Sequence, residues 1–206
     1  MITEADARAL DYGSTVVLVA GGHVTPLALD TLKARRITVV RDGIDPDAAD
    51  LAPASAIRTV AIAGDHTSLA LKSAIVRHLR GKGLAAHDLG TNATEPVDYP
   101  DTAAAAALAV ARGEADAAIV IDGAGLGSTI AANKVPGARA AMCSNTTLAR
   151  YAREHNGANV LALGSALVNG DEAIAIVDTF LGTPMREARY IRRLAKIRDL
   201  ERHPRR

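Results

Sequence analysis

The sequence predicts an α/β protein in which a parallel sheet is covered by helices on both faces. From Arg58 onward, short apolar runs alternate with segments of helical pattern, as expected for repeated βα units. Hydrophobic residues make up 49% of the chain but aromatic residues only 2%, so the core must be built from Ala, Val, Ile and Leu. These small aliphatic side chains suit strands that are buried on both faces by packed helices.

The expected strands of this region are short, and the first of them is a continuous apolar run. They fall at residues 59–63, 85–90, 117–121, 138–143 and 159–164. Helical patterns follow them at residues 69–83, 100–112, 130–134, 146–154 and 171–181, with a last basic helix from about residue 184.

Residues 1–45 have a pattern of their own, which predicts a small β-α-β extension. Strands are expected at residues 15–21 and 37–42, and between them a helix with Thr25 as N-cap and Pro26 at its first position. Residues 46–57 are rich in Asp, Ala and Pro and lack apolar periodicity, so we interpret them as a linker. The remaining residues, 58–206, are expected to form the main domain.

Composition excludes several classes of function. A net charge of +1 argues against general binding to nucleic acid or to a membrane surface, and no apolar run is long enough to span a membrane. The single cysteine, Cys143, allows neither an internal disulfide nor a cysteine metal cluster. The polar first residues are unlike a signal peptide, so a cytoplasmic location is expected.

Ligands of parallel sheets bind beyond the carboxyl ends of the strands, which directs attention to the loops there. One is Gly64–His66, one is the glycine loop Asp122–Ser128, and one follows Cys143. The G-x-G-x-G spacing of the glycine loop is neither a dinucleotide fingerprint nor a P-loop. From the residues alone, a structural turn and a cradle for an anion or oxyanion remain equally open.

Several long strings together resemble a known family. AIAGDHTSLALK, DLGTNATEPVDYP, GEADAAIVIDGAGLGSTIAANKVPGARAA, AREHNGANVLALGS and IVDTFLGTP are similar, in order, to the ribose-5-phosphate isomerase B and galactose-6-phosphate isomerase family. The resemblance implies a Rossmann-like three-layer fold with a five-stranded parallel sheet. It also implies an aldose–ketose isomerase without cofactor or metal, working as a homodimer or homotetramer whose active sites lie between subunits.

The family's site residues carry over onto matching positions of this chain. The glycine-loop amides of Gly123, Gly125 and Gly127 would stabilise the enediolate, and His155 would assist proton movement at the sugar oxygens. The residues that the resemblance assigns to substrate binding are Asp65, His66, Tyr99, Ser128, Asn156, Arg189 and Arg193, the two arginines being suited to phosphate.

Two positions depart from the family pattern. Asp122 replaces the usual cysteine that moves the proton between C1 and C2, and Ala124 replaces a threonine that helps to open the furanose ring. Some family members use an acidic residue instead of the cysteine, so Asp122 is expected to be the base. The missing threonine favours a substrate without a ring, such as a tetrose phosphate. The alternative is an inactive sugar-phosphate-binding or assembly protein in which Asp122 merely caps the loop.

The N-terminal strings ITEADARAL and VTPLALDTLKARRITVV resemble the leading segment of ethanolamine-utilisation enzymes, which belong to bacterial microcompartments. This resemblance implies that residues 1–45 are a docking or assembly segment and that the protein works inside a microcompartment. A β-α-β ornament packed on the isomerase is the equal alternative.

Overall fold

The computed structural model describes residues 1–18, 22–41, 51–54, 56–185 and 187–202, which form two compact units. One unit comprises Met1–Leu51 together with Glu187–Lys196, and the other comprises Ala52–Arg186 together with the end of the chain from Ile197. Half of the interpreted linker, and the last part of the first expected strand, lie outside the described residues. None of the described helices is long and apolar enough to cross a membrane.

The N-terminal unit contains the expected strand-helix-strand pattern with one further helix before it. Its elements are α1 (Glu4–Ala9), β1 (Thr15–Leu18), α2 (Pro26–Ala34) and β2 (Thr38–Arg41), and the two strands pair in parallel. Thr25 caps α2 through the Ala28 N–H, with Pro26 at the first position, as predicted. The helix α1 was not expected; a capping box between Thr3 and Asp6 starts it, and Ala7 is fully buried.

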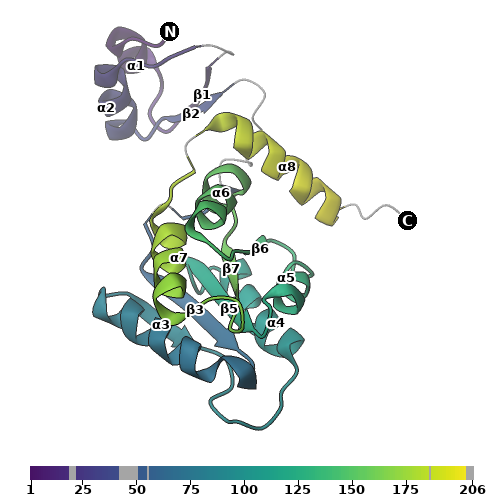
Figure 1. The fold of residues 1–206 in the computed structure, drawn as a ribbon. Coiled ribbons are helices and arrows are strands. Elements are labelled where there is room, and N and C mark those ends of the chain that lie inside the picture. Colours follow the sequence, from purple (N-terminus) through teal and green to yellow (C-terminus); the bar gives the residue numbers. More distant parts are fainter. Residues whose placement is uncertain (19–21, 42–50, 55, 186, 203–206) are drawn as a thin grey trace. The chain divides into compact units, whose positions relative to one another are not determined.

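The larger unit is the predicted five-stranded parallel sheet, in the order β4-β3-β5-β7-β6 (Figure 1). Its strands are β3 (Thr59–Gly64), β4 (Ala85–Asp88), β5 (Ala117–Asp122), β6 (Ala140–Met142) and β7 (Val160–Gly164). The three central strands are almost completely buried, because helices cover both faces of the sheet.

The helices divide into two layers. Those of the first layer are α3 (Leu69–Gly81), α6 (Thr146–Asn156) and α7 (Gly170–Gly182), which share a core of Ile, Leu and Val with Phe180. Those of the second are α4 (Tyr99–Ala111) and α5 (Leu126–Ala132), whose core against the sheet is made mostly of alanine. The small side chains of the second layer let α4 and α5 lie close to the strands.

The described residues include two further helical segments in and after the larger unit. A short 3-10 helix, η2 (His66–Ser68), joins β3 to α3. The last helix, α8 (Ala188–Arg202), begins later than its sequence pattern indicates. Its first part groups with the N-terminal unit, and its last turns group with the larger one.

Candidate active site

Asp122 is the last residue of β5 and has a buried carboxylate, with 5% of its surface exposed. Its Oδ1 accepts hydrogen bonds from the N–H groups of Ala124, at 2.8 Å, and Gly125. Its Oδ2 accepts one from the N–H of Ser128, also at 2.8 Å. The carboxylate therefore occupies the centre of the glycine loop.

Burial and hydrogen bonding act in opposite directions on the pKa of Asp122. Burial raises it, but the Ser128 hydroxyl and the backbone N–H groups of Ser128, Gly125 and Ala124 lower it more, so the pKa lies below the usual value of an aspartate. The three N–H bonds are the secure contribution, because the Ser128 Oγ has no hydrogen-bond partner of good geometry among the described residues. Asp122 is thus held in its ionised form.

The glycine loop has this shape because two of its glycines lie close to neighbouring atoms, one to backbone and the other to an aromatic ring. Gly125 has a φ of +75°, and a Cβ there would lie 2.9 Å from the carbonyl carbon of Leu163. A Cβ on Gly127 would lie 2.5 Å from the ring of Tyr99, so this tyrosine lies directly against the loop. Two predicted site residues are thereby brought together.

Asp65 and His66 follow β3 at the same edge of the sheet. The Asp65 carboxylate accepts hydrogen bonds from the N–H and hydroxyl of Thr67, at 2.9 and 2.6 Å, so it caps its own turn. The Val97 N–H donates to His66 Nδ1 at 3.2 Å, which places the proton of a neutral imidazole on Nε2. Thr67 in turn faces Gly123, since its Oγ1 would lie 4.0 Å from a Cβ there.

His155 and Asn156 lie at the opposite edge of the sheet. They end α6, which starts beyond the carboxyl end of β6 and returns toward the amino end of β7. Eleven residues of helix span about 16 Å, so these two side chains lie toward the amino edge of the sheet, away from the carboxyl edge where Asp122 ends β5. The His155 ring stacks on Tyr151 at 4.6 Å, and the Asn156 amide donates to the Tyr151 carbonyl.

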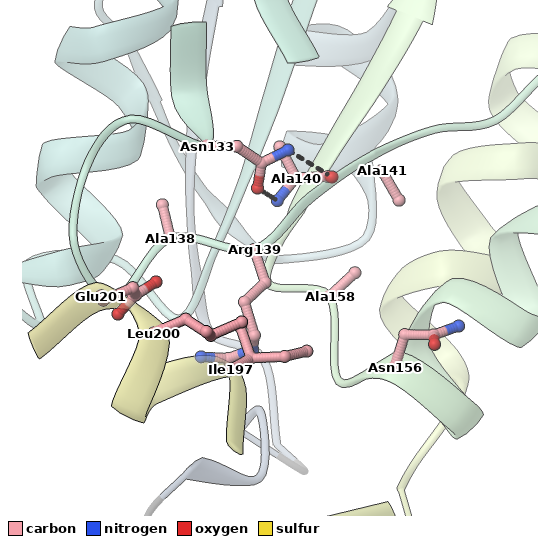
Figure 2. Close-up of a pocket in the computed structure, with 10 residues that line it drawn as sticks. All are labelled: Asn133, Ala138, Arg139, Ala140, Ala141, Asn156, Ala158, Ile197, Leu200 and Glu201. Atoms are coloured by element: carbon pink, nitrogen blue, oxygen red, sulfur yellow. Dashed lines mark hydrogen bonds between the residues drawn. The ribbon is translucent and has the colours of Figure 1, made fainter. Parts of the chain in front are cut away.

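Asn156 lines a cavity of about 430 Å³ beside the start of β6, which agrees with its place at the amino edge of the sheet (Figure 2). It is lined by Asn156 and Ala158 together with the start of β6 and the last turns of α8. A second cavity, of about 480 Å³, lies against α3 and the end of β4. Neither includes Asp65, His66 or Asp122, so these volumes do not coincide with the predicted chemistry.

The predicted phosphate-binding arginines lie on the first part of α8, which groups with the N-terminal unit. Arg189 forms an ion pair with Glu187 at 2.6 Å and donates to the Tyr190 hydroxyl. The Arg193 guanidinium lies over the Tyr190 ring, 5.7 Å from its centre.

Sequence reasoning missed two buried charged residues, Lys72 and Arg153, each 1% exposed. A signal for Lys72 was present: it shares the i, i+3, i+4, i+7 spacing of Ile75, Val76 and Leu79, the buried stripe of α3. A lysine on such a stripe needs anionic or carbonyl partners nearby.

Comparison with known proteins identifies the family. A model of the ribose/galactose isomerase family matches residues 60–197. The ribose-5-phosphate isomerase B of Escherichia coli strain K12 is 43% identical over 145 residues, which are 70% of this chain and 97% of that protein. The enzyme of the same name from Mycolicibacterium paratuberculosis is 39% identical over 145 residues, covering 69% and 91% of the two chains.

Solved structures agree with this match. The Clostridium thermocellum ribose-5-phosphate isomerase B has a TM-score of 0.69 and 47% identity, over 70% of this chain and 97% of that one. The Mycoplasma genitalium enzyme, solved with bound ribulose 5-phosphate, has a TM-score of 0.68 and 41% identity, over 70% and 97%. The resemblance carried by the glycine loop and the DYP and REHN strings is confirmed: the chain belongs to the ribose/galactose isomerase family and is by that membership a sugar-phosphate aldose–ketose isomerase.

Proposed function

We propose that this chain interconverts a phosphorylated aldose and ketose, either ribose 5-phosphate and ribulose 5-phosphate or a pair of tetrose phosphates, through an enediolate. The observation that carries the proposal is the buried, ionised carboxylate of Asp122 at the edge where Asp65, His66 and Tyr99 gather. The relatives named ribose-5-phosphate isomerase B support the reaction class.

Asp122 acts as the base that moves a proton between two neighbouring carbons. Its carboxylate takes the proton from C2 of the aldose, and the electrons of that bond form the C1=C2 double bond, which leaves negative charge on O1. The O2 proton passes to O1 with the help of His155, and Asp122 returns its proton to C1 as the C2 carbonyl forms. No proton or electron is gained or lost overall.

Backbone amides of the glycine loop stabilise the enediolate charge. The Gly125 N–H is already taken by the Asp122 carboxylate, so we assign this role to the Gly123 and Gly127 amides. Asp65, His66, Tyr99 and Ser128 line the sugar. Arg189 and Arg193, both exposed, hold the phosphate.

The second candidate is a protein that binds sugar phosphate without turning it over. The observation that favours it is the hydrogen bonding of Asp122, whose three backbone contacts are those of a loop cap and reduce its strength as a base.

A panel assay with Asp122→Asn separates the two candidates. Ribose 5-phosphate, erythrose 4-phosphate and erythrulose phosphate are followed by NMR in deuterated water, with calorimetry for binding. We expect C2 proton exchange and turnover in the parent, both lost in the variant while binding remains. Binding by the parent without any exchange at C2 would establish the second candidate, and unchanged turnover in Asp122→Asn would remove Asp122 from the mechanism.

The catalytic site is completed by a second copy of the chain, in a homodimer or homotetramer. His155 and Asn156 end α6 at the amino edge of the sheet, whereas Asp122 ends β5 at the carboxyl edge. A site that needs both must therefore take them from two protomers.

Mixed oligomers test the shared site. Asp122→Asn and His155→Gln variants, each inactive alone, are refolded or co-expressed together. We expect activity to return, because a mixed dimer contains one site with both native residues. Mixed oligomers shown by mass spectrometry to form, yet without activity, would contradict sharing.

Residues 1–45 act as a docking or assembly segment, with a microcompartment as the setting. Leu27 and Leu29 of α2 support this role, since 59% and 42% of their surfaces are exposed. Co-sedimentation of the chain with microcompartment shells, and its loss when both leucines are changed to Ser, is the measurement.

A further inference from the structure

Among the residues that the structure describes, Lys72 is the most heavily hydrogen-bonded buried charge that the mechanism leaves unused. Its ammonium lies 2.7 Å from both oxygens of Asp88, 2.7 Å from the Thr91 carbonyl and 2.9 Å from Asn92 Oδ1. All of these acceptors belong to the end of β4 and the first residues of the loop that follows it. One side chain of α3 therefore holds the start of the β4–α4 loop.

Burying an ammonium costs several kcal/mol before its partners offset it. The neighbours of Lys72 on the same helix face are Ile75, Val76 and Leu79, and an apolar residue would fit that stripe. Removal of a buried ion pair together with its partner is often neutral for stability. Stability alone thus gives no reason for a lysine here, whereas fixing the loop does.

The β4–α4 loop is tied to the site at both ends. At its start, the Leu89 N–H donates to the Ile62 carbonyl at 2.8 Å, and the Thr91 N–H donates to the Gly64 carbonyl at 3.2 Å. A Cβ on Gly90 would collide with the backbone of Gly64, so the loop presses directly on the end of β3. The Lys72 cluster therefore fixes where this loop crosses the carboxyl edge of the sheet.

At its far end the loop reaches two proposed substrate-binding residues. The Val97 N–H bonds His66 Nδ1, and Tyr99 lies against Gly127. The Val97 bond determines that Nε2 carries the proton of the neutral His66 ring. A shift of the loop would release both side chains, and misplacement by about 1 Å can cost roughly 100-fold in rate.

We infer that Lys72 is a positioning residue for the active site, which acts through the β4–α4 loop to set the tautomer of His66 and the place of Tyr99. The inference rests on the proposed function for its effect on turnover. Its effect on the His66 ring does not, because that is a property of the free protein.

The main test is the double variant Lys72→Met with Asp88→Asn, which removes the buried pair without leaving one charge alone. We expect a folded protein in which the ¹⁵N shifts of the His66 ring move toward a mixture of tautomers. On the best sugar phosphate, kcat/KM should fall roughly 10- to 100-fold. Lys82→Met is the matched control, since Lys82 lies at the end of the same helix but pairs with Asp178, and it should change neither reading.

Asn92→Ala gives a second reading that does not depend on the double variant folding. Asn92 is exposed and supplies one of the Lys72 contacts, so its loss should move the His66 shifts and kcat/KM in the same direction by a smaller amount. Parental His66 shifts in Asn92→Ala and in the folded double variant would overturn the inference. If the His66 shifts change in these variants but the parent protein turns over no sugar phosphate, the positioning role is upheld and the proposed function is rejected.

Discussion

At the level of single residues, the hydrogen bonds to the Asp122 carboxylate determine both its charge and its strength as a base. Its three backbone donors keep it ionised and also lower its affinity for a proton. Sequence could predict the residue and its place at the carboxyl end of an apolar strand, but not this balance. The balance depends on which N–H groups the loop directs at the carboxylate.

The pH dependence of stability follows from the lowered pKa of Asp122. Its folded pKa lies below the unfolded value of about 3.9, so its stabilising contribution is complete above that value and is lost as pH falls through the folded pKa. We expect Asp122→Asn to lower Tm by a constant amount above about pH 5, and the difference to shrink below about pH 4. Thermal unfolding of the parent and the variant from about pH 3 to about pH 8, a range that includes the pKa of an unfolded aspartate, measures this difference in Tm. A difference that grows on acidification would contradict the assigned pKa direction.

Cys143 should be inert although it is the only thiol. It is 1% exposed, and burial raises its pKa to about 11, so little reactive thiolate forms near neutral pH. Treatment with iodoacetamide at pH 7.5 should leave turnover unchanged and the protein mass unmodified. Rapid inactivation with protection by substrate would instead place a reactive thiol in the site.

At the level of elements, the central strands β3, β5 and β7 could be predicted well because each is a short, nearly continuous apolar run. The pattern at residues 117–121 became β5 with one further residue, Asp122, and Thr25 and Pro26 start α2 as expected. The helix α1 was missed because it is only six residues long and depends on packing of Ala7. The amino-edge position of His155 follows from the direction of α6, which becomes clear only once the parallel sheet is established.

The glycine loop provides a prediction with an internal control. Gly125 and Gly113 both have positive φ, +75° and +72°, but only at Gly125 would a Cβ meet backbone atoms. Gly113→Ala should cost about 1 kcal/mol of unfolding free energy through backbone strain alone. Gly125→Ala should cost more and also abolish turnover, because Leu163 and the loop must separate. Chemical denaturation and kinetic assays of both variants measure these effects. Equal losses of unfolding free energy would show that the backbone around Gly125 can move apart without strain.

At the level of the whole molecule, the family match covers nearly all of the larger unit's described part but only the segment Glu187–Lys196 of the N-terminal unit. The match begins at residue 60, while the segment Glu187–Lys196 groups with the N-terminal unit. The arginines proposed for phosphate are therefore carried by a helix that both units share.

Removal of residues 1–51 should affect phosphate binding more than chemistry. The truncated chain lacks most of the unit in which Arg189 and Arg193 lie, so we expect KM to rise about tenfold or more while kcat changes less. The full-length variant Arg189→Met with Arg193→Met should show the same pattern. Steady-state kinetics of the parent, the truncated chain and the arginine variant measure KM and kcat. A truncated chain with the parental KM would show that the two arginines bind phosphate without the N-terminal unit.

The direction of α6 also has a consequence for how the protein behaves in dilute solution. On the proposed shared site, a protomer with Asp122 at one edge of its sheet and His155 at the other would hold two half-sites and no complete one. Specific activity should then decline on dilution as protomers separate, and recover on concentration, following the law of mass action. Sedimentation and initial rates measured over the same dilution series should give one shared midpoint. Activity would thereby depend on the concentration of the protein itself as well as on that of its substrate.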